Sequence, residues 1–380
     1  MLRETFLIKF FRRLTAYENH YPPETGYCRG SHYLFRRNGL DTLLHLIAIL
    51  IGIFGLLVYF RSVIRVMLLN WRERDLISYF AAVAAVVLIR RFTDSGAGYE
   101  RIQRSQAWVF PVFVILSVAF WFLLVQLCFT LILWGTRAET SFIYSFTASG
   151  SALSTLGFKT PSSWLGEFLA IVEGAMGLAI VVLLFSFVPG YLAAVQARER
   201  KVGWLYDRTE GHPTYQTVLE GMNTSEQDIN DTGIWEDWEA WFRGIYETHT
   251  TAPILTFVPS IYHGANWLRT SASILDTASL LMSVLDEKKT YAAHMCRDIG
   301  ARTIQLLAKE LHITAPSLGR AIPHSPDLPA NTFDLVYNQL VANGVPVNPD
   351  KEKCRETFTQ LRAEYAADLN QISRITSMPL

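Results

Sequence analysis

Long apolar runs occupy the first half of the chain, and polar segments separate them. Residues 40–60, 107–134 and 164–188 are each long enough to cross a bilayer, since about 20 apolar residues span its hydrocarbon core as a helix. Residues 76–89 form a shorter run near the lower limit for a span. The pattern predicts an all-α membrane protein with four spanning helices, or with three if residues 76–89 lie at the membrane interface.

Beyond residue 196 the apolar residues recur with helical spacing instead of forming long runs. Further helical patterns are expected at residues 234–246, 267–288, 290–311, 332–343 and 351–375. Polar or proline-rich composition is typical of loops at residues 222–233 and 314–331. One face of the first pattern carries four aromatic residues, which we expect in the core or at a subunit interface: Trp235, Trp238, Trp241 and Phe242. We therefore predict an α-helical cytoplasmic domain over residues 199–380.

The segment between the second and third long runs has a different character. Residues 140–163 read TSFIYSFTASGSALSTLGFKTPSS, which is aromatic and rich in hydroxyl groups, and a polar break follows Phe158. Non-helical backbone at membrane depth is tolerated only inside protein or along a water-filled cavity. The order of helix, short re-entrant segment and helix therefore makes residues 155–158 a candidate pore lining.

These residues carry a resemblance to a known superfamily. Thr155-Leu156-Gly157-Phe158 resembles the Thr-Val-Gly-Tyr start of the potassium-channel filter, and it also lies between two spanning helices. The longer string FTASGSALSTLGFKTP is similar to one pore repeat of the Trk/Ktr potassium transporters. Residues 250–276 resemble a region that follows the pore in some prokaryotic ion-channel-like proteins. The resemblance covers roughly residues 106–196 and implies one helix–pore loop–helix unit per chain.

The resemblance implies a division of the chain and a set of ion ligands. Residues 106–198 would form a pore domain of outer helix, pore helix, filter and inner helix, preceded by peripheral transmembrane helices in residues 39–105. Backbone carbonyls that replace the hydration shell of a cation give such filters their selectivity. The implied ligands of permeant K+, and of Na+ if selectivity is relaxed, are Thr155, Leu156, Gly157 and Phe158, supported by Ser154. One chain supplies one quarter of each ring, so the expected assembly is a homotetramer.

Lys159 stands where the channel filter usually has its second glycine, a glycine that Trk/Ktr repeats also lack. We therefore expect less strict selectivity for K+ over Na+, because fewer carbonyls would face the axis. Glu173 lies within the third long run, and a carboxylate inside a membrane is costly. Two arrangements stay open. Glu173 pairs with Lys159 behind the filter and braces it, or Lys159 points to outer water and Glu173 hydrogen-bonds within the bundle.

Small residues and a proline interrupt the same run. Gly174 and Gly177 lie midway along it, and Pro189 lies near its end. They are candidate gating hinges, because glycine permits bending and proline kinks a helix. The alternative is that the glycines are packing positions, since small residues are common where membrane helices meet. We favour packing for the glycines and a kink for Pro189.

Arginines set the expected topology. Residues 90–105, predicted as a polar loop, hold Arg90, Arg91, Arg101 and Arg104, and basic residues prefer the cytoplasmic side. Residues 1–38 mix basic and apolar residues with helical spacing, as in an amphipathic helix on the anionic leaflet or in an ordinary docked helix. We expect a multi-pass protein, of the plasma membrane, whose two termini are cytoplasmic.

Several function classes receive no support from the sequence. The formal net charge is +0, which does not indicate nucleic-acid binding, and the four cysteines are far apart. The histidines have no metal-ligand spacing, and no phosphate loop or nucleophile elbow occurs. We therefore expect a non-enzymatic protein without a cofactor. The first hypothesis is a tetrameric cation channel whose cytoplasmic domain gates or assembles it, with a cytoplasmic ligand left open.

Two other hypotheses stay open. The chain could be a membrane-anchored sensor or scaffold whose pore-like motif does not conduct. It could also be a Trk/Ktr-like transporter subunit, although those chains carry four pore repeats and we find one here.

Overall fold

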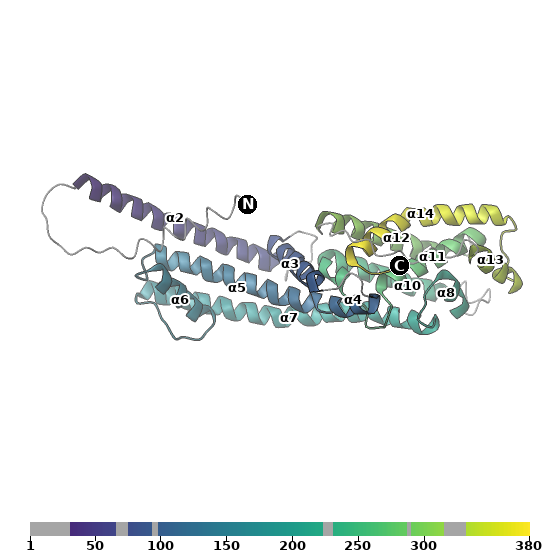
Figure 1. Cartoon of the computed structure of the whole chain (residues 1–380), viewed down its shortest axis with the longest axis horizontal. Helices are drawn as coiled ribbons and strands as arrows, with labels where there is room; N and C mark the ends of the chain where they lie inside the picture. The colour runs from purple at the N-terminus through teal and green to yellow at the C-terminus, as the bar shows by residue number, and fades with distance from the viewer. Residues whose placement is uncertain (1–30, 66–74, 93–97, 223–230, 287–289, 315–331) are drawn as a thin grey trace. The chain divides into compact units, whose positions relative to one another are not determined.

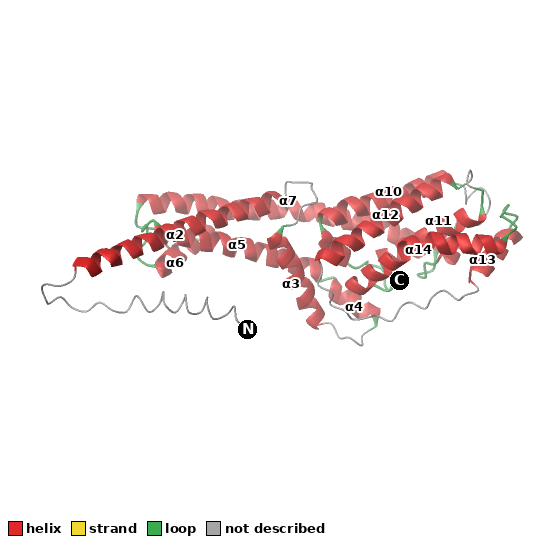
Figure 2. Cartoon of the chain, turned by 90° about the horizontal axis from the view of Figure 1, so that it is seen from above, coloured by secondary structure: helices red, strands yellow, loops and turns green. Residues whose placement is uncertain are grey.

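The computed structural model describes residues 31–65, 75–92, 98–222, 231–286, 290–314 and 332–380. All regular structure in these ranges is helical and none of it is strand, as the sequence pattern predicts (Figure 2). Most of the expected amphipathic segment at 1–38 and of the expected loops at 222–233 and 314–331 lies outside the described residues. The described ends of the two loops include the first residues of α10 and the last residue of α12, which are helical. The chain divides between residues 47 and 48 into two units, and all the contacts below lie within the second.

Three described helices are long and apolar enough to cross a membrane. They are α2 (Ser31–Val63), α5 (Val109–Gly135) and α7 (Trp164–Arg208). The fourth apolar run forms α3 (Leu76–Phe92), which at 17 residues is not among the three. Membrane-spanning character is therefore carried by three helices, and a fourth span stays a prediction.

The apolar helices share a core of their own. α6 (Phe142–Leu153) lies against both α5 and α7 (Figure 1). Buried side chains from four helices meet there: Tyr59 and Val63 of α2, Trp121, Val125 and Phe129 of α5, Leu153 of α6, and Met176 and Ile180 of α7. Gly52 of α2 allows close packing on α5, because an added Cβ would lie 2.7 Å from the Cys128 carbonyl oxygen.

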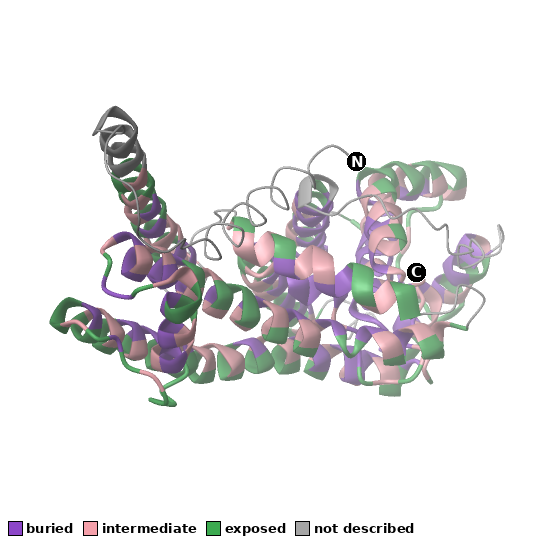
Figure 3. Cartoon of the chain, turned by 60° about the vertical axis from the view of Figure 1, so that its left-hand side comes forward, coloured by how far each residue is buried: buried purple, intermediate pink, exposed green. Residues whose placement is uncertain are grey.

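A second core fills the helical region that follows the spans, where Figure 3 shows many buried residues. Its elements are α8 (Tyr215–Gly221), α10 (Thr232–Thr251), the short 3-10 helix η2 (Pro253–Phe257), α11 (Trp267–Val284), α12 (Tyr291–Thr314), α13 (Thr332–Ala342) and α14 (Lys351–Thr376). The predicted aromatic face of α10 is buried in this core, with Trp238 only 1% and Phe242 0% exposed. The helical character of residues 199–380 is thus confirmed wherever the structure describes it.

One predicted loop is helical instead. Within residues 90–105 the structure has the end of α3 and a separate helix, α4 (Tyr99–Gln106). Charged composition suggested a loop, but α4 buries two glutamines, Gln103 and Gln106, whose side-chain amides donate hydrogen bonds to backbone carbonyls elsewhere. Polar docking of this kind leaves no apolar pattern in the sequence.

The membrane helices and the helical region also share packing. α7 stays helical through Pro189 and across the expected boundary at residues 198 and 199, ending only at Arg208. The second core includes Val109 and Phe113 of α5 and Ala81 of α3, together with the side chains of the later helices. The expected boundary therefore falls inside one helix, and no loop separates the two parts there.

Candidate pore segment and the junction at the end of α7

Serine side chains fix where α6 begins and how the chain leaves it. The Ser141 hydroxyl accepts a hydrogen bond from the Tyr144 N–H at 3.3 Å and so caps the start of the helix. At the other end, the buried Ser151 receives the chain that follows. Its carbonyl accepts from the N–H of Leu156 at 3.1 Å and of Gly157 at 3.3 Å, and its hydroxyl accepts from the Lys159 N–H at 2.9 Å.

This anchoring leaves the carbonyl oxygens of residues 155–158 without a donor from any described residue. Both Thr155 (φ 57°) and Gly157 (φ 67°) adopt the left-handed conformation, which is costly for threonine and easy for glycine. The side chains of Leu156 and Phe158 are 72% and 69% exposed in the single chain. The segment thus offers four successive unpaired carbonyls and two uncovered apolar side chains.

Lys159 folds back over α6. Its ammonium lies 3.7 Å from the centroid of the Tyr144 ring, and 3.4 Å from both the Tyr144 carbonyl and the Thr147 hydroxyl. An ammonium over an aromatic face is attracted by the ring quadrupole. The Lys159 side chain therefore packs within its own chain, on the face of α6 that carries Tyr144 and Thr147.

Glu173 of α7 is fully buried, but Lys159 is not its partner. The Ser149 hydroxyl of α6 donates to one carboxylate oxygen of Glu173 and also lies 3.0 Å from the Gln126 carbonyl of α5. The other carboxylate oxygen has no hydrogen-bond partner among the described residues. The brace between Glu173 and Lys159 is therefore not formed, because their side chains contact different faces of α6. The alternative, a hydrogen bond within the bundle, is the arrangement seen.

The glycine candidates lie where α7 passes the end of α6. A Cβ on Gly177 would overlap the Leu153 carbonyl, and one on Gly174 would lie 3.2 Å from the Ala152 carbonyl oxygen. Close helix approach thus accounts for both glycines, as the packing interpretation expects. Pro189 lies inside α7, where its ring removes the donor that the Phe185 carbonyl would otherwise receive.

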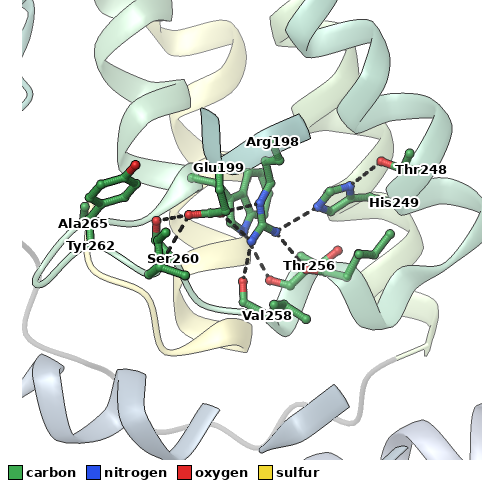
Figure 4. Close-up of polar contacts among 12 residues, drawn as sticks. Arg198, Glu199, Thr248, His249, Thr256, Val258, Ser260, Tyr262 and Ala265 are labelled. Carbon is green, nitrogen blue, oxygen red and sulfur yellow. Dashed lines mark hydrogen bonds and ion pairs between the residues drawn. The ribbon is translucent and has the colours of Figure 1, made fainter. Parts of the chain in front are cut away.

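A second polar cluster lies near the far end of α7, centred on Arg198, which is 3% exposed (Figure 4). Its guanidinium donates to the Glu199 carboxylate at 2.9 Å and to the carbonyls of Leu255 at 3.1 Å and Val258 at 2.9 Å. It also lies 3.3 Å from Nε2 of His249 on α10. These four hydrogen bonds use four of the five N–H donors of an arginine, and Nη2 also lies 2.8 Å from the Glu199 carboxylate as an ion pair. The cluster ties α7 to the chain just after α10.

The geometry assigns the His249 tautomer. Arginine only donates, so Nε2 accepts from Arg198, and Nδ1 carries the proton and donates to the Thr248 hydroxyl at 3.0 Å. Burial, and to a lesser degree the Arg198 guanidinium, lower the pKa of His249 well below its ordinary value. The neutral ring is also packed against the Trp267 ring, with centroids 5.3 Å apart.

Glu199 and Gln103 extend the cluster to α4. The second carboxylate oxygen of Glu199 accepts from the Ser260 hydroxyl and from the Ile261 N–H at 3.4 Å. The Gln103 amide donates to the carbonyls of Ser260 at 2.6 Å and Tyr262 at 2.7 Å, while its oxygen accepts from the Gly264 N–H at 3.3 Å. Residues 253–266 thus connect the end of α7 with the helix that leads into α5. We call this arrangement, with Arg198, Glu199, His249, Ser260 and Gln103, the α7 junction.

The sequence did not single out the α7 junction. Arg198 and Glu199 stand in the charged string ARERK, which is typical of a solvated helix end, and His249 is one of the histidines that have no metal-ligand spacing. Among the described residues no group of acidic, histidine and cysteine side chains has a metal-ligand arrangement. Only one feature of the sequence includes this region. Residues 250–276, which resemble a region that follows the pore in some prokaryotic ion-channel-like proteins, contain most of the connecting loop.

Comparisons with known proteins add no relative. No family model matches the chain, and no curated protein and no solved structure matches it either.

Proposed function

We propose that this chain assembles into a homotetrameric cation channel that conducts K+. In this proposal α5 is the outer helix, α6 the pore helix, residues 155–158 the filter, and α7 the inner helix. The helical region after Arg208 serves gating or assembly. The protein would act in a membrane, and the permeant cation would be its only ligand at the filter.

The observation that carries the proposal is the row of unpaired carbonyls in residues 155–158. A buried or membrane-embedded carbonyl without a donor is costly unless water or a cation replaces the missing partner. The N–H groups of Leu156 and Gly157 are directed to the Ser151 carbonyl, so the segment has a donor side turned to its own chain. The carbonyl oxygens are then available for a dehydrated cation, as filters require.

Exposed apolar surface supports assembly. Leu156 and Phe158 are largely exposed, and so are Ile171 at 71% and Phe185 at 75% on α7. Lipid can cover the α7 positions, but side chains beside a row of polar carbonyls need protein cover. Further copies of the same segment, arranged about an axis, would supply this cover and complete the ring of carbonyls.

The proposal is tested by reconstituting the purified full-length chain. Its particle mass in a nanodisc should equal four copies, and liposomes loaded with K+ should release it when a proton ionophore balances the charge. A tetramer that releases no cation would support the rival scaffold function, and a monomer or dimer would contradict the filter assembly. Gly98→Ala, at an exposed glycine with negative φ and no atom near the added methyl, is the matched control for filter glycine variants.

A further inference from the structure

α4 has an exposed face whose side chains form no hydrogen bond or ion pair with any described residue. Arg101 and Arg104 are exposed, and Trp108, directly after the helix, is 62% exposed. Positions three and seven residues apart lie close together on a helical surface, so the two guanidinium groups and the indole point to the same side. We call Arg101, Arg104 and Trp108 the basic face of α4.

The opposite side of α4 is fixed to protein. Gln103 donates to carbonyls of the loop at residues 260–265, and Gln106 donates to the Thr376 carbonyl at the end of α14. The backbone then passes into α5 through hydrogen bonds from Ala107 to Gln103 and from Trp108 to Ser105, both 3.1 Å. The basic face therefore cannot turn inward without breaking buried hydrogen bonds.

The basic face lies at the membrane end of a spanning helix. The apolar sequence of α5 begins at Val109, directly after Trp108. Tryptophan is enriched at membrane interfaces, where its ring is partly in lipid and its N–H meets water. At a rise of about 1.5 Å per residue, Arg104 lies about 6 Å and Arg101 about 10 Å from Trp108 along the helix axis. The headgroup layer is about 5–8 Å thick on each side, so Arg104 lies within it and Arg101 lies just beyond its outer edge.

No described carboxylate neutralises the basic face. Neither arginine forms an ion pair with any described residue, although Glu100 lies on the same helix and is exposed. By contrast, exposed arginines elsewhere do find a carboxylate, such as Arg243 with Glu239 at 2.7 Å. Two guanidinium groups that pair with no carboxylate of the described residues lie beside an interfacial indole. They match a lipid phosphate, since guanidinium binds phosphate oxygens with two parallel hydrogen bonds.

We propose that the basic face of α4 binds the headgroup of an anionic phospholipid, of the phosphatidylglycerol class. The phosphate lies between Arg101 and Arg104, and the Trp108 indole rests on the lipid at the start of its acyl chains. Because Gln103 connects α4 to the loop that holds Glu199, an occupied basic face also restrains the α7 junction. This inference needs only that α5 spans the membrane, and does not depend on conduction.

The test titrates the purified full-length chain in neutral detergent with short-chain phosphatidylglycerol and with phosphatidylcholine of equal chain length. Thermal unfolding is measured for the unmodified protein, for Arg101→Gln/Arg104→Gln, and for Arg302→Gln, which removes an exposed arginine of α12. Only phosphatidylglycerol should raise the unfolding temperature of the unmodified protein. Each arginine near a lipid surface contributes about fivefold in affinity, so the double variant should bind about 25-fold more weakly.

The controls separate this surface from general charge attraction. Arg302→Gln should respond like the unmodified protein, and free glycerophosphoglycerol should give no response. Arg101→Lys/Arg104→Lys should respond less than the unmodified protein and more than the double glutamine variant, because lysine keeps the charge but not the paired hydrogen bonds. Equal stabilisation by phosphatidylcholine, equal response of the double glutamine variant, or an equal shift with the free headgroup would each overturn the proposal. All variants should unfold at the same temperature without lipid, because the substituted side chains are exposed.

Discussion

The pore segment lies between α6 and α7, whereas the α7 junction lies toward the C-terminal end of α7, and the polar groups of the two regions are satisfied in opposite ways. In residues 155–158 the N–H groups of Leu156 and Gly157 bond to their own chain, and the four carbonyls have no donor among the described residues. At the α7 junction each of the three guanidinium nitrogens of Arg198 has an acceptor, and Glu199 uses both of its oxygens. One chain therefore completes the junction but not the pore segment. This contrast suggests that the junction is structural within each chain, whereas the pore segment requires an ion and other copies.

The largest expected effect concerns the pore segment. Gly157→Ala should abolish conduction, because a methyl group on a residue with φ 67° strains the backbone and displaces the carbonyls. No atom lies within 4 Å of the added Cβ, so the fold of each chain and the assembly should survive. Cation flux from liposomes measures the loss, and the particle mass checks the assembly. A flux equal to that of the unmodified protein would contradict the proposal that residues 155–158 form the filter.

At the α7 junction the expected effect is on stability. Arg198→Met leaves the Glu199 carboxylate buried and unpaired, which costs about 3–5 kcal/mol of unfolding free energy. Arg243→Met breaks an exposed pair with Glu239 and should cost less than about 1 kcal/mol. Denaturant unfolding followed by circular dichroism compares them, and the double variant Arg198→Met/Glu199→Gln should recover part of the loss. Similar losses for Arg198→Met and Arg243→Met would contradict a junction held by matched buried charges.

A smaller effect should follow pH. The pKa of His249 is lowered in the folded state. Near pH 6.5 the unfolded chain therefore binds a proton at this residue, whereas the folded chain does not. Stability from this group is present above that pH and falls as pH drops, by about 1.4 kcal/mol per pH unit for one proton. Arg198 is the charged group in contact with the ring, and it opposes protonation. His249→Gln should flatten the decline between pH 6.5 and 5, and an unchanged slope would exclude His249 as its source.

The smallest expected effect separates Lys159 from Glu173. Lys159→Gln removes a positive charge near the outer end of the proposed filter, and should raise cation current more at low salt than at high salt, since salt screens the repulsion. Glu173→Gln should leave that salt dependence unchanged, because Glu173 is bonded to Ser149 and not to Lys159. Single-channel conductance at two ionic strengths measures both. A fall in current at low salt in Glu173→Gln would instead indicate that Glu173 neutralises Lys159, and would contradict the separate contacts seen in the structure.

Sequence periodicity was sufficient for the helices and for the buried aromatic face of α10, because burial of large apolar groups leaves a repeat in the sequence. It was insufficient for α4 and for the α7 junction, where buried polar side chains do the packing. Gln103 and Arg198 look solvent-exposed in sequence, and only the carbonyls that they reach in three dimensions make them interior. The Lys159–Glu173 pairing failed for another reason. The positions of Lys159 and Glu173 along the sequence do not show which face of α6 each side chain contacts.

The central claim is that residues 155–158 of several copies conduct a cation. Its most direct test is the reversal potential of the reconstituted full-length chain in a planar bilayer, with K+ on one side and Na+ on the other. The account predicts a current that reverses toward the K+ equilibrium potential, less fully than in a channel with two filter glycines, and that disappears in Gly157→Ala but not in Gly98→Ala. A reversal potential that does not depend on which cation is on which side would contradict the account, and so would an unchanged current in Gly157→Ala.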